Sequence, residues 1–520
     1  MNSFKPMLLT SLKSYDSAQF AKDVTAGIIV AIIALPLSIA LALASGVGPE
    51  AGIFTAIVAG FVISALGGSC VQIAGPTAAF ATIVAGIVAR DGLEGLMTAT
   101  ILAGVFLIIM GFCHFGSLIK FIPYTITTGF TSGIAVTIVI GQLKDFCGVT
   151  YPDGVKPIET MEKLKAFAEN FSTISPDALI VGGVSLAILI VSPLIFKKIP
   201  GSLIAVIAGI LMVQFLPLHV STIGNLYTIS NALPTLHLPV FDMKLIQSAI
   251  PNAFTIAVLA AIESLLSCVV ADGMINSKHR SDTELIAQGA GNIASALFGG
   301  IPATGAIART AANIKNGGRT PVAGMVHSIT LVIVLVVLMP FAGMIPMPTI
   351  AAILFLVAYN MCQWRTFVHL VRTAPKSDII VLFTTFVLTV VFDLVVAIEI
   401  GMVLACLLFI KRMSEETHAD SWVYVDDDSP AVDEHLQKLP LEIRVYEITG
   451  PLFFGAADAI EHIVVKDFTK CLVLRMRSVP AIDSTAMNAL QNLTKLCESK
   501  GITIVFSHVN EQPMHVMEKS

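Results

Sequence analysis

The sequence predicts an all-α membrane domain of about fourteen segments, arranged as two inverted seven-segment repeats with two half-helices, followed by a small α/β domain. Three observations lead to this prediction. Apolar runs of membrane-spanning length recur from about Asp23 to Ile410. Charge returns from Lys411 onward, including three successive aspartates at 426–428. Two Gly- and Pro-rich breaks lie at matching places in the two halves of the apolar part.

Composition separates this chain from ordinary soluble proteins. Of 520 residues, 55% are hydrophobic and 13% are charged, whereas soluble domains have about 25% charged residues. The first apolar run follows a polar segment without a small-residue cleavage pattern, so we expect no signal peptide. The eight cysteines are scattered and form no CxxC pair. We therefore expect them to act as small apolar side chains, without a disulfide or a metal site.

The apolar runs and the charge distribution define the expected domains. We expect a cytoplasmic N-terminal segment at 1–22, a transmembrane transport domain at 23–412, a linker at 413–440 and a small domain at 441–520. Helical segments are predicted to begin near residues 23, 49, 76, 94, 121, 177, 201, 253, 283, 306, 321, 348, 377 and 393. The segments near 76–90 and 306–315 are too short to span a bilayer, and each follows a break.

Lysine and arginine in the loops predict the orientation. With a cytoplasmic N-terminus and alternating helices, the inner loops hold about twice as many of these residues as the outer loops. We therefore expect a multi-pass protein of the cell (inner) membrane, with both termini in the cytoplasm.

The two breaks share a sequence pattern. Ala-Leu-Gly-Gly at 65–68 and Ile-Ala-Gly-Pro-Thr at 73–77 precede the first short helix, and similar stretches at 296–300 and 301–305 precede the second. The breaks occupy the same position in each seven-segment half, and an odd number of segments inverts the second half. Paired breaks of this kind indicate a transporter's binding site. The alternative is that Gly and Pro are simply frequent in membrane helices.

A helix that begins inside the membrane exposes unpaired amides and about half a positive charge. Such helix starts bind anions. We therefore expect a small anion as the substrate. The expected substrate-binding amides are those of Thr77, Ala78 and Ala79 in the first half and of Ala306, Ile307 and Ala308 in the second.

Two ionisable residues stand out within the apolar runs. Glu263 is the only charged residue between Asn252 and Ala271, and Arg309 directly follows the second half-helix start. Charges at this depth are costly and are usually functional. We expect Arg309 to bind the substrate. The alternative is that Glu263 and Arg309 pair only to fasten the helix bundle.

The charge at this site suggests how transport is driven. Two half-helix starts supply about half a positive charge each and Arg309 one more, which suits a divalent anion. An ionised Glu263 would cancel part of this attraction, and both a low-dielectric surrounding and a bound dianion favour its neutral form. Anion and proton would then bind together. We expect Glu263 and Ser267 as the coupling-ion site, the proton as the coupling ion and no other cofactor. Sodium is the rival ion.

The residues that carry these features resemble the SulP family of anion transporters. The matching stretches are 35–36, 75–79, 261–266 and 299–313. The resemblance covers essentially the whole chain. It implies two inverted seven-segment repeats that form core and gate subdomains, elevator-like alternating access, a homodimer and a cytoplasmic STAS domain. It also implies that the anion lies between the two half-helix starts.

Stretches 130–134, 144–146 and 271–274 are similar to the bacterial branch that includes proton-coupled C4-dicarboxylate transporters. This resemblance implies proton-coupled symport of a divalent anion, either sulfate or a C4-dicarboxylate. The sodium-coupled bicarbonate branch is similar to a pattern with Asp where this chain has Glu263. Sodium-coupled bicarbonate transport and an uncoupled anion channel or exchanger are the alternatives.

The C-terminal domain has an α/β pattern. Strands are predicted at 441–449, 471–476 and 502–506, and helices at 456–464 and 485–499. The turn 482–486 is similar to the STAS loop that carries a phosphorylatable Ser or Thr. We favour the alternative that it is the N-cap of the following helix. The chain ends soon after Phe506, so we expect a STAS-like domain that is trimmed or minimal.

Several function classes have no support in the sequence. A GxxxxGK[ST] loop for ATP is absent, as is a basic, aromatic-interleaved stripe for nucleic acid. We therefore expect neither an enzyme nor a nucleic-acid-binding protein. A sensor that signals through the C-terminal domain is a further class. A buried acid favours a coupled transporter over a channel, because an anion pore gains nothing from a fixed negative charge.

Overall fold

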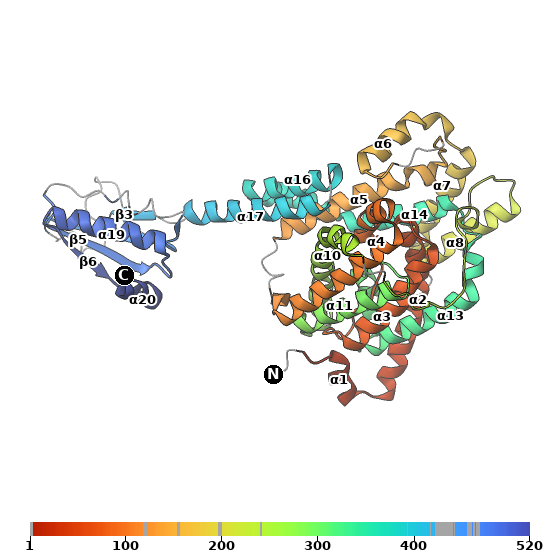
Figure 1. Cartoon of the computed structure of the whole chain (residues 1–520), viewed down its shortest axis with the longest axis horizontal. Helices are drawn as coiled ribbons and strands as arrows, with labels where there is room; N and C mark the ends of the chain where they lie inside the picture. Colours follow the sequence, from red (N-terminus) through yellow and green to blue (C-terminus); the bar gives the residue numbers. More distant parts are fainter. Residues whose placement is uncertain are drawn as a thin grey trace. The chain divides into compact units, whose positions relative to one another are not determined.

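The computed structural model describes residues 4–117, 123–152, 157–195, 200–239, 242–392, 394–415, 418–421, 440, 442–454, 460, 463 and 468–520. The chain forms two compact units, Met1–Gly401 and Met402–Ser520 (Figure 1). Eight stretches of described helix are long and apolar enough to cross a membrane.

The first unit is helical. Its longer helices are α2 (Ser17–Ala44), α3 (Pro49–Leu66), α4 (Ala78–Phe112), α5 (Tyr124–Cys147), α7 (Pro176–Ile195), α8 (Gly201–Phe215), α10 (Met243–Ile275), α11 (Ser281–Leu297), α13 (Val322–Ala342), α14 (Met347–Cys362), α16 (Lys376–Val391) and α17 (Leu394–Glu415), which continues into the second unit. Shorter helices are α1 (Met7–Ser11), α6 (Thr160–Glu169), α9 (Ile223–Leu226), α12 (Ile307–Lys315) and α15 (Trp364–Thr373), with 3-10 turns at Leu12–Ser14 and Phe171–Thr173.

The expected membrane segments all have helical counterparts. The segments expected near 76 and 94 are the two parts of α4, which is interrupted at Gly92 by a backbone with φ 71° that glycine adopts readily. Helix α10 begins at Met243 rather than near 253, because it continues through polar residues and Pro251 beyond the apolar run. The amphipathic helices α6 and α15 were not expected.

The two breaks meet as a short antiparallel ribbon. Strand β1 (Ala74–Gly75) pairs with β2 (Thr304–Gly305), with Ala74 opposite Gly305. The Ala306 amide extends the ribbon by donating to the Ile73 carbonyl at 2.9 Å. Each strand is followed by a half-helix start, so the expected inverted arrangement with two half-helices is confirmed.

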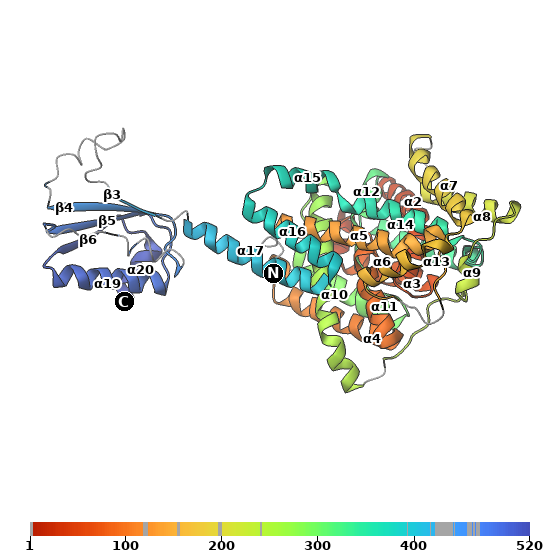
Figure 2. The same cartoon turned by 90° about the horizontal axis from the view of Figure 1, so that it is seen from above.

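Helices of the first unit pack in two groups. In one group, α4 packs against both α10 and α11, and α13 packs against α2 and α3. In the other, α5 packs against α14 and α16, and α7 against α14 and α8 (Figure 2). Glycines allow the closest approach: a Cβ on Gly104 of α4 would lie 2.6 Å from the Gly289 carbonyl oxygen of α11. Small residues at such crossings are typical of membrane helices.

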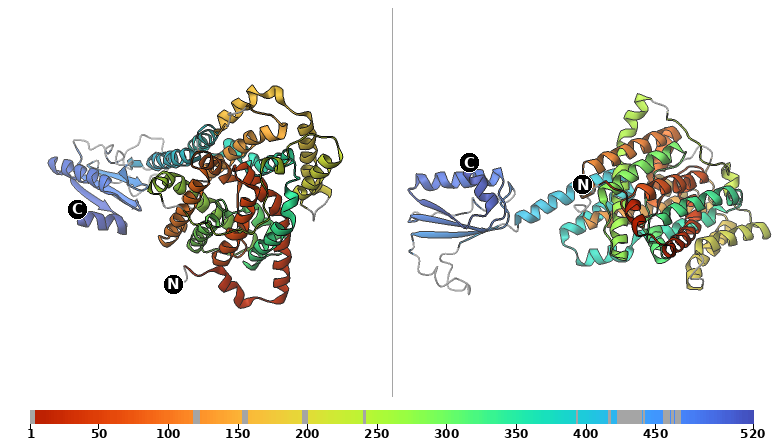
Figure 3. Two further views of the ribbon diagram at one scale, coloured as in Figure 1. Left: turned by 45° about the vertical axis from the view of Figure 1, so that its right-hand side comes forward. Right: turned by 90° about the horizontal axis from the view of Figure 1, so that it is seen from below.

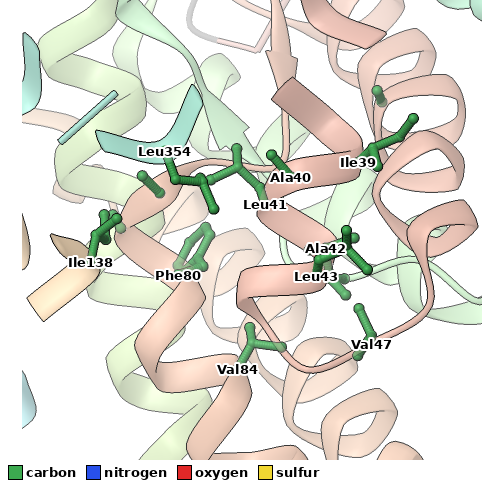
Figure 4. Packing of buried hydrophobic residues seen from close by; sticks show 14 of the residues in the cluster. Ile39, Ala40, Leu41, Ala42, Leu43, Val47, Phe80, Val84, Ile138 and Leu354 are labelled. Carbon is green, nitrogen blue, oxygen red and sulfur yellow. The ribbon is translucent and has the colours of Figure 1, made fainter. Parts of the chain in front are cut away.

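An apolar cluster lies where the two helix groups meet. Figure 4 shows Leu41 of α2 close to Phe80 of α4 and Leu354 of α14, with Ile138 of α5 on one side of Phe80 and Leu43 of α2 on the other. All five side chains are buried. The first turn of α4 is therefore held between both groups.

The second unit contains a four-stranded mixed sheet. Its strands are β3 (His418–Ser421), β4 (Ile443–Thr449), β5 (Cys471–Ser478) and β6 (Thr503–Ser507), in that order. Strand β3 is antiparallel to β4, and β4, β5 and β6 are parallel. Helices α19 (Ser484–Ser499) and α20 (Glu511–Lys519) lie on the same face of the sheet (Figure 3).

The predicted strands near 441–449, 471–476 and 502–506 and the helix at 485–499 are observed, within a few residues at their ends. The helix expected at 456–464 lies largely outside the described residues. Strand β3, inside the expected linker, and α20, after the last strand, were not expected. Strand β3 has four polar and small residues, and α20 has nine residues, fewer than the window over which a helical period is recognised.

Candidate functional site

Both half-helices begin at residues with extended backbone. Thr77 is the N-cap of α4, with φ −125° and ψ 159°. Ala306 is the N-cap of α12, with φ −97° and ψ 109°. Because β1 and β2 run antiparallel, the segments that follow them leave the ribbon in opposite directions. The start of α4 therefore lies beside β2, and the start of α12 lies beside β1.

The first-turn amides differ in their availability. The Ala306 amide already donates to Ile73, whereas the amides of Ile307, Ala308 and Arg309 have no acceptor within their own helix. At the other start, Ala78 and Ala79 are in the corresponding first-turn positions.

The two helix starts also differ in exposure. Ala78 and Ala79 are buried, with exposed fractions of 6% and 0%, and Thr77 is half-buried. Ile307 is 41% exposed, and Ala308 is exposed as well. The first turn of α12 is therefore accessible. At the start of α4, only the N-cap residue Thr77 is partly accessible.

Glu263 connects α10 to the first half-helix. Its Oε2 accepts a hydrogen bond from the Thr77 hydroxyl at 2.9 Å. The next residue, Ser264, lies 2.7 Å from the Thr304 hydroxyl and accepts from the Gly305 amide at 3.0 Å. Two successive residues of one helix therefore hold both breaks, which fixes the half-helix starts relative to each other.

Arg309 connects the second half-helix to the first break. Its side chain is 2% exposed, and its Nη2 donates to the Pro76 carbonyl. Its Nε and Nη1 have no hydrogen-bond acceptor in the part of the chain that the structure describes. These donors, in a buried cation beside two helix starts, form an electropositive site.

The alternative of a fastening ion pair is not observed. Among the described residues, the ion pairs do not include one between Glu263 and Arg309. The carboxylate instead binds the Thr77 hydroxyl, and the guanidinium binds the Pro76 carbonyl. Glu263 and Arg309 thus bind two adjacent residues of the first break, Thr77 and Pro76.

Ser267 lies one helical turn after Glu263 but contacts a different group. Its hydroxyl is 3.4 Å from that of Thr310, which in turn accepts from the Ile73 amide at 3.1 Å. Ser267 therefore reaches α12 and, through Thr310, the residue that precedes β1. Within the described residues, no cluster of three or more His, Cys, Asp or Glu side chains has a metal-binding arrangement.

Sequence analysis did not identify Glu284 as part of the site's support. This buried carboxylate on α11 accepts from the amides of Gly68 and Ser69, at 2.8 and 3.2 Å, and from Gln72 and Gln288, both at 2.9 Å. It fixes the loop that enters the first break. Glu284 did not stand out in the sequence, because it lies near the start of a predicted segment and acidic residues are common in the first turn of helices.

Comparisons with known protein families place the chain. The model of the sulfate permease family matches residues 20–385, and that of the STAS domain matches residues 438–520. The chain is 38% identical to the "Putative sulfate transporter YvdB" of Bacillus subtilis, covering 98% of this chain and 95% of that protein. It is 34% identical to the "Bicarbonate transporter BicA" of Picosynechococcus sp., covering 90% of this chain and 85% of that protein.

Solved structures show the same fold. The transmembrane domain of a cyanobacterial bicarbonate transporter BicA is similar with a TM-score of 0.67 and 30% identity, covering 74% of this chain and 98% of that one. The structure of SLC26A9 is similar with a TM-score of 0.86 and 19% identity, covering 99% of this chain and 88% of that one. The chain belongs to the sulfate permease family of membrane anion transporters and carries a STAS domain at its C-terminus.

Proposed function

We propose that the protein is a secondary active transporter that moves a divalent anion, sulfate or a C4-dicarboxylate, together with a proton. The observation that carries this proposal is the β1–β2 ribbon, which brings two half-helix starts and the buried Arg309 together. Such a constellation favours an anion, because free amides, helix dipoles and a guanidinium all attract negative charge.

The anion would bind between the half-helix starts. On one side it would reach the amides of Ala78 and Ala79 and the Thr77 hydroxyl. On the other it would reach the first turn of α12 and the free guanidinium donors of Arg309. A dianion matches this site best, since two partial charges and one full positive charge surround it.

Proton coupling rests on the position of Glu263. Its carboxylate lies against the N-cap of the first half-helix through Thr77. A dianion bound there would favour the neutral acid, so the loaded site would carry a proton. Ser267 would support this coupling site only through α12, because its hydroxyl contacts Thr310.

The two packing groups support elevator-like alternating access. The ribbon, both half-helices, α10 and α11 belong to one group, which would move as a body against the group of α5, α7, α14 and α16. We further propose that the protein acts as a homodimer in the cell membrane, with both termini in the cytoplasm. The excess of Lys and Arg in the expected inner loops supports this orientation.

Bicarbonate transport driven by sodium is the second candidate. It is favoured by the 34% identity to BicA, whose name states that it transports bicarbonate. Sodium fits less well here, because this chain has the longer Glu263 where the sodium-coupled pattern has Asp.

Uptake by proteoliposomes tests the proposal. Purified protein would be supplied with labelled sulfate, succinate or bicarbonate under separate proton and sodium gradients. We expect sulfate or succinate uptake that an inward proton gradient accelerates in the absence of sodium. Bicarbonate uptake that requires sodium would support the second candidate instead. Anion flux that follows only the membrane potential would indicate a channel.

A further inference from the structure

A small polar cavity lies next to the first half-helix. It has a volume of about 130 Å³ and is lined by α2, α4, α5 and α6. The polar lining residues include Thr82 of α4, Gln142 and Asp145 of α5, and Lys163 of α6. Leu43 and Ile138, which Figure 4 shows beside Phe80, form part of its apolar wall.

The cavity begins close to the proposed anion site. Ala81, which lines it, is four residues after the N-cap Thr77, and four residues of helix rise about 6 Å. The direction of α4 from Thr77 leads toward Arg90, which lies in an expected outer loop. The cavity therefore lies between the half-helix start and the outer surface.

Among the described residues, Lys163 is the only lysine or arginine that lines this cavity. Its side chain is half-buried, and burial lowers the pKa of Lys163. In the described part of the chain, no carboxylate lies within ion-pair distance of its ammonium group. Asp145 lines the same cavity and also lacks an ion-pair partner there. A partly desolvated ammonium that makes no ion pair gains from contact with an anion.

We propose that this cavity is the outer entry site for the transported anion and that Lys163 draws the anion into it. The inference rests on the proposed function, because it takes the same anion as its ligand. Lys163 supplies the attraction, and the Gln142 amide supplies further donors. Asp145 keeps the local net charge near zero, so the anion binds weakly enough to move on to the half-helix start.

The walls of the cavity suit an entry site. Helices α2 and α4 form one side and α5 and α6 the other, so movement of one packing group against the other changes its size. Lys163 would then contribute before the anion reaches Arg309. Its effect is on capture from outside and not on the transport step.

The first test compares two lysines of α6. Lys163→Gln is expected to raise the external anion concentration for half-maximal uptake by about tenfold, without changing the maximal rate. Lys165→Gln removes the same charge from a side chain that is 75% exposed and lies 3.9 Å from Glu169, so it should leave uptake unchanged. Equal effects of the two substitutions, in a protein whose wild type transports the anion, would overturn the inference while leaving the proposed function intact.

The second test does not depend on transport. In a variant without the native cysteines, Thr82→Cys should react with a membrane-impermeant thiol reagent added from outside, and sodium sulfate or sodium succinate should slow the reaction. Lys163→Gln in the same background should remove this protection. No reaction from outside, or a rate that neither salt changes, would overturn the entry site whatever the transport assay shows.

Discussion

At the scale of single residues, Arg309 differs from an ordinary structural arginine. It is buried, yet only its Nη2 is hydrogen-bonded within the described residues, to the Pro76 carbonyl. Leaving buried donors unpaired is costly, and natural proteins accept that cost mainly at functional sites. In the proposed site, the free Nε and Nη1 would donate to the anion.

Arg309→Ala is expected to weaken anion binding by about 2 kcal/mol, or about thirtyfold, since it removes charged hydrogen-bond donors. Arg309→Lys should restore only part of the binding, because an ammonium group lacks the planar fork. Isothermal titration with sulfate and succinate measures both effects. Arg90→Ala is the control, since the Arg90 side chain is 62% exposed and pairs with Asp91. Unchanged affinity in a folded Arg309→Ala protein would make Arg309 purely structural.

The sequence identified some residues of the site and missed others for a physical reason. Glu263 and Arg309 were found because a charge within an apolar run is conspicuous. Glu284 and Thr304 were missed, because neither is unusual where it stands in the sequence. Their importance appears only when α11 and the two breaks come together. The hydrogen bond from the Ala306 amide to the Ile73 carbonyl is also a tertiary contact, so the sequence did not predict it.

At the scale of elements, Asp23 fastens the start of α2 to the loop after α12. Its buried carboxylate accepts from Tyr15 at 3.0 Å, Gln19 at 2.9 Å, the Arg319 amide at 2.9 Å and the Thr320 hydroxyl at 2.5 Å. Burial, together with Asp23, raises the pKa of Tyr15 to about 12, so its hydroxyl remains a donor. The N-terminal segment is thus tied to the end of the second half-helix.

Asp23→Ala should lower the free energy of unfolding by about 3 kcal/mol, because it leaves several donors unpaired in a buried place. Asp23→Asn keeps the shape and should cost less. Thermal unfolding in detergent measures the difference, with the exposed Asp16→Asn as a control at the N-cap of the same helix. If Asp23→Ala unfolds at the wild-type temperature, the network has no stabilising role.

Elements were predictable where their pattern is periodic. The apolar runs located the membrane-spanning segments, because hydrophobic length specifies them, and the Gly- and Pro-rich breaks located both half-helices. The β1–β2 ribbon was not predicted as strands, since two residues carry no periodicity. Helices α6 and α15 were missed because each has only ten residues and contains no long continuous apolar run.

At the scale of the whole molecule, the STAS domain is a separate compact unit with its own apolar core. Buried side chains from its sheet and α19 form that core, including Ile448, Leu472, Leu474, Met476 and Leu490. The change in charge near Lys411 predicted such a unit from sequence. Its strand β3 was not predicted, because it has only four polar and small residues.

Removing residues 416–520 should alter expression, assembly or transport rate without changing which anion is carried. The reason is that every residue of the proposed anion site lies in the first unit. This truncation ends after α17 and removes β3 together with its partner β4. Competition of sulfate, succinate and bicarbonate for labelled uptake measures selectivity. A changed order of preference would assign the STAS domain a part in substrate recognition.

The central claim is that Glu263 couples anion movement to protons. The direct measurement is uptake by proteoliposomes under an inward proton gradient without sodium, compared between wild type and Glu263→Gln. Low external pH should load Glu263 and accelerate wild-type uptake, whereas Glu263→Gln should lose this acceleration and still exchange anions across the membrane. Glu399→Gln, at an exposed position on α17, should behave like wild type. A wild type that ignores pH and requires sodium would contradict the claim and make Glu263 a sodium ligand.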